Sequence, residues 1–485
     1  MADLVSFEPA TGAPLWHGRT GDVEAEVAAA RAGWTGWAAR PLPYRIETLR
    51  RFANVVRARH EAFADLLARE TGTPLWEARA EIDGCIARVD ASVSGYAERT
   101  AQRRLDSPMG GRTALRHRPH GVLGVIAPAC QPVGIIAGHV IPALIAGNAV
   151  VVKPSHKTPA AAAMLATCLH EAGVPEENLR LVHGGAAEGR ALAAHPDLDG
   201  LFFTGSARVG AILHRAAADR PDRLLALEMG GNNAILAWDT PDVATAAAIV
   251  VQSAFASAGQ RGTAAGRLVV GEDLAVPLVE EIARLADRLI VGAPHEDPPP
   301  FMGPVIDDAA ADGLIDGFLD LILRGGRAIR HLGRLDPDRP FLRPAIIDVT
   351  GIAEQNVTGV AGQNVTGVAG GRDVPLFGPV LQVVRVASFE EGIAEVNATR
   401  FGLSATLLSQ TPALYDRFWA GARAGIVNWN RPSHGAGPGA PVGGTGWSGN
   451  HRPGGFYAAD RCAYPVVSSE AETARAALGI GLRDR

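Results

Sequence analysis

Cysteine is scarce in this chain, which has only four in 485 residues. Cys85, Cys130, Cys168 and Cys462 are far apart and form no CxxC pair, so the sequence excludes a disulfide scaffold and indicates no metal site. No cysteine occurs between Cys168 and Cys462. That long interval therefore contains no thiol for nucleophilic catalysis.

The sequence also lacks an apolar run long enough to cross a membrane. Its nearest candidate, Val133 to Val152, is interrupted by three glycines, a histidine and a proline. The amino terminus has neither the basic nor the apolar region of a signal peptide. The net charge is −5, with basic residues scattered among acidic ones. We therefore expect a cytoplasmic protein with reduced cysteines, and neither nucleic acid nor membrane as a partner.

What is present is the composition of a globular enzyme, with 47% apolar and 20% charged residues in a length that suits two or three domains. The first hundred residues are predicted to be helical. Asp22 can cap a helix running to about Arg40, and Gly72 can end another that contains Ile46 and Phe63.

From Gly121 onward, short apolar strands alternate with helical segments. The strands are predicted at 122–127, 149–153, 179–182 and 201–204, and the helices at 133–146, 159–172 and 189–194. This alternation indicates βαβ units and a parallel sheet with helices on both faces. A second α/β segment begins near Gly230 and continues past Phe401.

Two segments interrupt this order. Strand-like flanks around a Gly-Gly turn, between Leu105 and Arg118, predict a projecting hairpin whose edge needs a partner strand. Residues 348–370 contain three short copies of one motif at a spacing of eight residues. Three copies are too few for a solenoid, so we interpret them as a duplication that lengthens a surface loop.

Glycines and a lysine at strand ends are candidates for binding a phosphate. Gly205 and Gly210 follow a buried strand and open a helix, whose N–H groups can face an anion. Lys153 ends another strand, where open parallel sheets bind cofactors. The alternatives are a tight turn at the glycines and a solvated surface lysine.

Further motifs occur in order along residues 5–470, at 152–156, 203–210, 377–379 and 397–404. With 226–233 and 257–263 they resemble the aldehyde dehydrogenase superfamily. The narrower resemblance is to the succinylglutamate semialdehyde dehydrogenases, carried by segments 200–206, 225–233, 252–261, 426–430 and 448–452.

The resemblance implies an α/β fold with two doubly wound parallel-sheet domains plus a β-hairpin oligomerisation element. Residues 1–98 and 121–229 would form the dinucleotide-binding domain and 230–445 the catalytic-type domain. Residues 99–120 and 446–485 would assemble a homodimer or homotetramer. The implied ligands are NAD or NADP and a small aldehyde or acyl molecule. The implied cofactor-binding residues are Lys153, Ser155, Gly205, Ser206, Gly210 and Phe377.

Four positions depart from the family pattern. Glu228 stands where the family has its general base, but Gly262 occupies the position of the nucleophilic cysteine. Cys130 replaces an asparagine whose amide would stabilise the oxyanion, and a thiol is a weak donor. His156 and Pro375 replace the glutamates that would hold the two ribose groups. These losses predict a pseudoenzyme, inactive or strongly impaired in aldehyde oxidation, with cofactor binding weakened or lost.

Several alternatives stay open. Glu228 is either a surviving general base or a structural hydrogen-bonding partner. Cys130 is either a relocated nucleophile, which would give an enzyme of altered chemistry, or a small buried apolar residue.

The substrate-binding candidates are Arg261, Asn430 and Arg452, each of which can equally have a structural role. A ligand-binding or structural partner protein and an ordinary semialdehyde dehydrogenase are the other functions considered. The last needs a nucleophile that the sequence does not offer.

Overall fold

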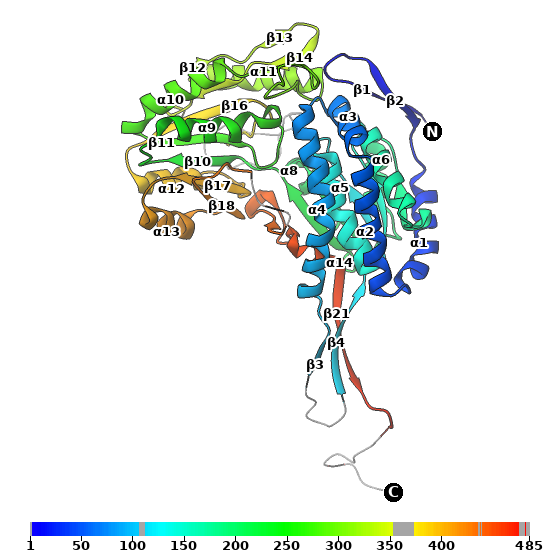
Figure 1. The fold of residues 1–485 in the computed structure, drawn as a ribbon. Helices are drawn as coiled ribbons and strands as arrows, with labels where there is room; N and C mark the ends of the chain where they lie inside the picture. The colour runs from blue at the N-terminus through cyan, green and yellow to red at the C-terminus, as the bar shows by residue number, and fades with distance from the viewer. Residues whose placement is uncertain are drawn as a thin grey trace.

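The computed structural model of the protein describes residues 2–105, 112–352, 373–434, 437, 439–474 and 481. Two large, mostly parallel sheets form the body, and a small antiparallel sheet projects from it (Figure 1). The predicted α/β fold is confirmed. The copies of the repeat within 353–372 lie outside the described residues.

The first large sheet has five strands, all parallel, in the order β7-β6-β5-β8-β9. They are β5 (Val122–Ile126), β6 (Ala149–Lys153), β7 (Leu179–Leu181), β8 (Gly200–Gly205) and β9 (Leu224–Met229). The chain winds from β5 to one edge and then returns to β8 on the other side. The carboxyl ends of β5 and β8 therefore flank the topological switch point, where such sheets bind ligands.

Helices cover both faces of this sheet, as the alternation of strands and helices predicted. Val122 and Val151 pack under α1, whereas Leu123 and Val150 face the cluster around α5. The helices of this part are α1 (Val23–Ala38), α2 (Leu42–Ala58), α3 (His60–Thr71), α4 (Leu75–Arg99), α5 (Pro132–Ala146), α6 (Pro159–Glu171), η1 (Glu176–Asn178), α7 (Ala186–Ala194) and α8 (Ala207–Ala216).

The second large sheet has seven strands in the order β12-β15-β16-β11-β10-β17-β18. Only its edge strand β12 runs antiparallel to its neighbour. The strands are β10 (Asn233–Ala237), β11 (Ala265–Gly271), β12 (Arg327–Arg330), β15 (Ala345–Asp348), β16 (Val380–Val386), β17 (Ser404–Leu408) and β18 (Ile426–Trp429).

Helices again lie on both faces of the seven-stranded sheet, with α9 and α10 on one side and α12 and α13 on the other (Figure 1). Helix α11 contributes residues to clusters on both faces. Their bounds are α9 (Val243–Phe255), η2 (Ala256–Gly259), α10 (Glu272–Asp287), α11 (Asp308–Leu323), α12 (Phe389–Asn397) and α13 (Pro412–Gly421). A small ribbon beside them pairs β13 (Arg334–Asp336) with β14 (Arg339–Leu342).

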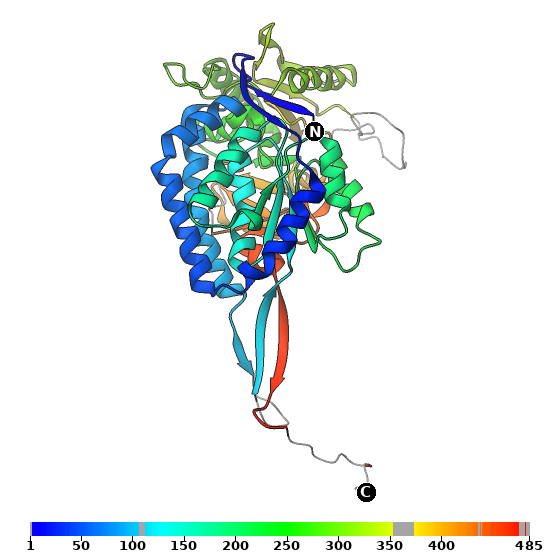
Figure 2. The ribbon, with the colours of Figure 1, turned by 90° about the vertical axis from the view of Figure 1, so that its right-hand side faces the viewer.

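The projecting sheet has the order β21-β4-β3 and extends away from the body (Figure 2). The expected hairpin strands are present as β3 (Arg103–Leu105) and β4 (Arg112–Pro119), while the turn between them lies outside the described residues. β21 (Ala463–Glu470) pairs with β4 along its whole length and covers one edge of the hairpin. Its role in oligomerisation stays a prediction.

The segment that leads into the projecting sheet crosses the body. It contains β19 (Pro441–Val442), η3 (Gly446–Ser448), β20 (Gly454–Gly455), η4 (Phe456–Ala458) and α14 (Ala459–Cys462). In the described residues, no helix joins the length to the apolar character that a membrane crossing requires.

Two expectations for the first hundred residues were wrong. Residues 3–19 form a hairpin of β1 (Asp3–Phe7) and β2 (Pro14–Arg19), because Pro9 and Gly12, with φ of +71°, turn the chain back between the strands. The helix predicted to end at Gly72 is two helices, α2 and α3, which meet at Arg59. Gly72 does end α3, with φ of +77°.

Candidate active site

Glu228 lies on β9 and is engaged on both carboxylate oxygens. Its Oε1 forms an ion pair with Arg461 Nη2 at 2.8 Å, and its Oε2 accepts a hydrogen bond from Thr204 Oγ1 at 3.1 Å. Thr204 is the residue directly opposite on β8, so the parallel register places it there. Arg461 comes from α14, far along the chain.

His139 of α5 completes a closed set of contacts that we call the Glu228 ring: Glu228, Arg461, His139 and Thr204. His139 Nε2 lies 2.8 Å from Thr204 Oγ1, and its Nδ1 lies 3.0 Å from Arg461 Nη2. Because the guanidinium can only donate, Nδ1 accepts and Nε2 carries the proton. A neutral His139 with its proton on Nε2 therefore makes both of its contacts within the Glu228 ring.

Burial and the Arg461 charge set the protonation states of this ring. Burial lowers the pKa of His139 to about 4 although Glu228 opposes this, so the histidine is neutral at pH 7. Burial by itself would raise the pKa of Glu228, but the Arg461 guanidinium holds it below its ordinary value. Glu228 is thus an ionised carboxylate with a permanent cationic partner.

Arg461 is almost fully buried. Its side chain is 2% exposed, and its guanidinium lies 5.0 Å from the centre of the Phe202 ring. Gly454 covers the ion pair, since a Cβ at that position would lie 2.4 Å from Glu228 Oε1. Arg461 is therefore enclosed by the fold, while 20% of the Glu228 side chain stays exposed.

Gly262 lies in the loop between η2 and β11. Its carbonyl accepts a hydrogen bond from Asn233 Nδ2 at 2.8 Å, and Asn233 Oδ1 accepts one from the backbone N–H of Ser404 at 2.9 Å. A Cβ at Gly262 would meet only Leu403 Cδ2, at 3.6 Å, and the backbone is not left-handed. Neither space nor backbone conformation requires glycine here.

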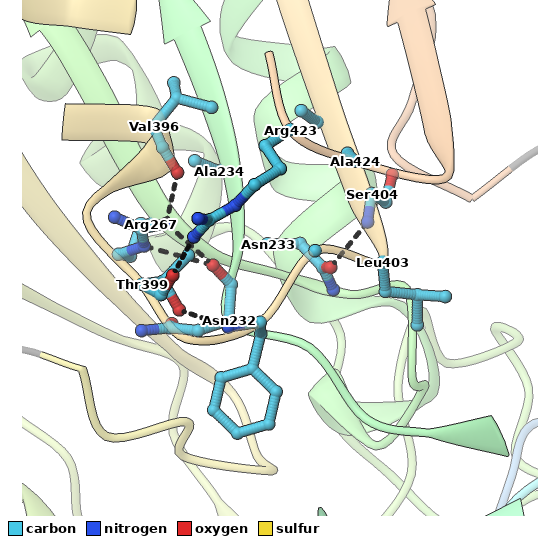
Figure 3. Close-up of a pocket in the computed structure, with 13 residues that line it drawn as sticks. Asn232, Asn233, Ala234, Arg267, Val396, Thr399, Leu403, Ser404, Arg423 and Ala424 are labelled. Carbon is cyan, nitrogen blue, oxygen red and sulfur yellow. Dashed lines mark hydrogen bonds between the residues drawn. The ribbon is translucent and has the colours of Figure 1, made fainter. Parts of the chain in front are cut away.

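Asn233 and Leu403, which contact Gly262, also line a small polar pocket, drawn in Figure 3. Arg267 is buried there and donates to the carbonyls of Asn232 and Val396, each at 2.9 Å for Nη2. Arg423 donates to the carbonyl of Thr399. The cavity of about 10 Å³ has room for one water molecule, so these groups hold loops together and do not form a ligand site.

Cys130 follows β5 in the turn before α5 and is partly buried. Burial, reinforced by the nearby Glu81 carboxyl, raises the pKa of its thiol to about 12, although Arg261 acts in the opposite direction. Glu81 itself accepts hydrogen bonds from the N–H groups of Val133 and Gly134, both at 2.9 Å. The first turn of α5 is therefore already occupied by a carboxyl group.

Arg261, a substrate-binding candidate, forms an ion pair with the buried Glu77 of α4 and donates to Ser257 Oγ at 2.6 Å. A second pocket lies alongside, and Phe377, Pro375 and Arg261 are among the residues that line it. Phe377 is 43% exposed, which leaves its ring available to a ligand. A role for Arg261 in binding substrate stays a prediction.

The other two substrate-binding candidates have structural contacts. Asn430 donates to the carbonyl of Ser409 and accepts from its N–H, at 2.8 and 3.0 Å. Arg452 is exposed, and its carbonyl accepts from Arg461 Nη1 at 3.0 Å. Both positions stay predictions as ligand contacts.

Five of the six predicted cofactor residues lie at the carboxyl edge of the five-stranded sheet, whereas Phe377 precedes β16 of the other sheet. Lys153 ends β6 and donates to the carbonyl of Pro154 at 2.8 Å, and burial lowers its pKa to about 8. Ser155 Oγ accepts from the N–H of Lys157 at 3.2 Å, and His156 is exposed.

Gly205, Ser206 and Gly210 occupy the neighbouring strand-to-helix turn. Ser206 caps α8, with its Oγ accepting from the N–H of Val209 at 3.4 Å. A Cβ at Gly210 would lie 2.2 Å from Met229 Sδ, so glycine there lets α8 pack closely on β9. The exposed Ser206 leaves the start of α8 open to an anion.

Sequence reasoning missed Arg461, His139 and Thr204. His139 had a local signal, since it is a lone polar residue in an apolar helix, but Arg461 had none. Within the described ranges, no group of three or more histidine, cysteine, aspartate or glutamate residues is arranged to hold a metal ion.

Comparison with known proteins identifies the family that has this architecture. The model of the aldehyde dehydrogenase family matches residues 3–354 and 364–465. The chain is 58% identical over 482 residues to the N-succinylglutamate 5-semialdehyde dehydrogenase of Sphingopyxis alaskensis, covering 99% of this chain and 97% of that protein. It is 45% identical to a Caulobacter vibrioides protein of the same name, covering 99% and 98%.

Among solved structures, the 1-pyrroline-5-carboxylate dehydrogenase from Thermus with bound NAD is similar, with a TM-score of 0.88 and 25% identity over 97% of this chain and 90% of that one. A crystal structure of a putative aldehyde dehydrogenase from Burkholderia cenocepacia has the same TM-score and 27% identity, over 98% and 96%. The chain belongs to the aldehyde dehydrogenase family.

Proposed function

We propose that this protein keeps the fold and the ligand sites of an aldehyde dehydrogenase but is inactive or strongly impaired in aldehyde oxidation. The observation that carries the proposal is Gly262. Oxidation of an aldehyde in this family proceeds through a covalent adduct with a thiolate, from which hydride leaves, and glycine cannot form that bond. The relatives named above suggest a semialdehyde as the ligand class.

The surviving carboxylate supports this proposal. A general base must exchange a proton near neutral pH, so its pKa should lie near the working pH. Glu228 instead has a lowered pKa and a buried ion pair with Arg461. We infer that Glu228 joins β9 to the carboxyl-terminal segment and no longer serves as a base.

The residues present fit a nicotinamide cofactor only in part. NAD or NADP would supply the hydride acceptor when bound. The open start of α8 follows β8 at the switch point of the sheet, and Lys153 ends β6, one strand further along. A dinucleotide there would meet a helix N-terminus and a nearby cation. His156 and Pro375 offer no carboxylate to the ribose hydroxyls. We therefore expect NAD or NADP to bind weakly.

A second candidate function is an enzyme of altered chemistry that uses Cys130. The observation in its favour is the Arg261 charge, which acts to stabilise the thiolate. The burial and the Glu81 carboxyl outweigh it, because a pKa near 12 leaves only about one thiol in thirty thousand ionised at pH 7.5. We rank this candidate below the first.

We also propose that the chain forms a homodimer or homotetramer in the cytoplasm. The projecting β21-β4-β3 sheet supports assembly, because it extends from the body with β3 and β21 as open edges.

The test is NAD(P)H formation by the unmodified chain with a panel of aliphatic semialdehydes, beside the variant Cys130→Ala. We expect no turnover above the uncatalysed rate from either protein. Turnover by the native chain that disappears in Cys130→Ala would establish the altered enzyme. Turnover that persists in Cys130→Ala would contradict both candidates.

A further inference from the structure

Helix α4 presents three charged side chains along one side: Glu77, Glu81 and Arg88. Their spacings of four and seven residues put them on a common face. Glu77 pairs with Arg261, and Glu81 accepts from the first N–H groups of α5. Each acidic member of the row therefore has a partner within the fold.

Arg88 has none in the part of the chain that the structure describes. It forms no hydrogen bond and no ion pair with those residues, and its Nε is buried without a partner. The residue as a whole is partly exposed, so a solute can reach the guanidinium. A buried donor without an acceptor destabilises the folded protein. An unpaired, partly buried arginine therefore favours the binding of an anion.

The groups around Arg88 do not supply that anion. Burial lowers the pKa of Arg88, and Glu228 is the carboxylate that acts most strongly on it. Yet both oxygens of Glu228 are held within the Glu228 ring, and His139 is neutral. The Glu228 carboxylate is already paired with Arg461, so it does not serve Arg88 as a partner of its own.

We propose that Arg88 binds the carboxylate of an aliphatic acid ligand beside Glu228. The planar guanidinium fork matches a carboxylate in two parallel hydrogen bonds, which a hydrated chloride or an aldehyde oxygen does not. The proposal rests on the proposed function in one respect, namely that the ligand site survives the loss of the nucleophile. It adds the residue that recognises the carboxyl end of such a ligand.

The test is isothermal titration of the full-length protein with succinate, glutarate and butyrate, and with succinamide as a neutral analogue of succinate. The variants are Arg88→Met, which removes the charge and keeps much of the side-chain length, and Arg88→Lys. The matched control is Arg79→Met, because Arg79 is an exposed arginine of the same helix that pairs with Glu61. Circular dichroism and the melting midpoint establish that each variant is folded.

We expect at least one of the three carboxylates to bind the native protein, and succinamide to bind at least tenfold more weakly than succinate. Arg88→Met should weaken the binding about tenfold or more, Arg88→Lys by less, and Arg79→Met by less than about twofold. The proposal is overturned if no carboxylate binds at concentrations up to about 10 mM, or if Arg88→Met binds as the native protein does.

Binding is measured without turnover, so this result is separate from the test of the proposed function. A native protein that oxidised semialdehydes would contradict the proposed function while leaving the Arg88 measurement to be judged by itself. Conversely, an inactive protein that bound none of the carboxylates would agree with the proposed function and would contradict the Arg88 site.

Discussion

Replacing Arg461 with methionine should raise the pKa of Glu228 and destabilise the folded protein at neutral pH. In the native protein, the guanidinium outweighs the effect of burial and keeps the pKa of Glu228 below its ordinary value of 4.5. Without it, burial acts unopposed and the pKa should rise above that value. At neutral pH, the variant must then hold an uncompensated buried carboxylate.

The size of the effect follows from that burial. Removing one partner of a buried ion pair destabilises a protein by about 3–5 kcal/mol, because the other charge is left unpaired. An unfolding entropy of about 2 cal/mol/K per residue gives a chain of this length about 1 kcal/mol for each degree. The melting midpoint of Arg461→Met should therefore fall by about 3–5 °C at pH 7.5.

The dependence on pH has a definite sign. The lowered pKa of native Glu228 contributes stability that is present above pH 4.5 and is lost as the pH falls below it. In Arg461→Met the raised pKa of Glu228 reverses this contribution to stability. Protonation of Glu228 therefore stabilises the variant. The difference between the two melting midpoints should shrink as the pH falls from 7.5 toward 5.

The assay is differential scanning calorimetry of the native protein, Arg461→Met and the double variant Arg461→Met/Glu228→Gln. The double variant removes the unpaired charge of Glu228 and should recover more than half of the decrease in melting midpoint. A loss below about 1 °C, or a loss that does not change with pH, would refute the reasoning about this ion pair.

Three further predictions concern single positions. The pKa of about 12 at Cys130 predicts alkylation by iodoacetamide at pH 8 about a thousandfold slower than a free cysteine, and selective labelling of Cys130 would contradict it. Burial and Arg261 lower the pKa of His434 to about 4, so the stability that its neutral form provides is lost as the pH falls from 6.5 toward 4. His434→Gln should reduce the acid-induced fall of the melting midpoint, and an unchanged fall would count against this. Gly259 has φ of +68°, and a Cβ there would lie 2.1 Å from the carbonyl oxygen of Gly378, so Gly259→Ala should lower the melting midpoint clearly more than Gly262→Ala does. Equal midpoints for these two alanine variants would contradict it.

Local sequence patterns predicted much of the five-stranded sheet. The observed bounds of β5, β6 and β7 agree with the predicted strands to within a residue, because apolar runs bounded by turn residues are a local signal. The hairpin at residues 3–19 was missed, since its strands are short and half exposed. The break at Arg59 was missed because the apolar spacing continues from α2 into α3.

The candidate site was predictable only where a motif carried it. Glu228 and Gly262 stood out because each lies in a segment that resembles the family. Arg461 and Arg88 did not, because their significance depends on contacts made or missing between parts of the chain that are remote in sequence. No spacing rule reveals that an arginine on α14 pairs with a glutamate on β9.

The most direct measurement of the central claim is NAD(P)H formation by Gly262→Cys with the semialdehyde panel, beside Gly262→Ala and the native protein. The loop accepts a Cβ, so both variants should fold and differ only by the thiol. We predict turnover in Gly262→Cys alone, at a low rate because Glu228 is paired with Arg461 and we expect NAD or NADP to bind weakly. Equal turnover in the native protein or in Gly262→Ala would contradict the claim that the missing nucleophile is what prevents aldehyde oxidation.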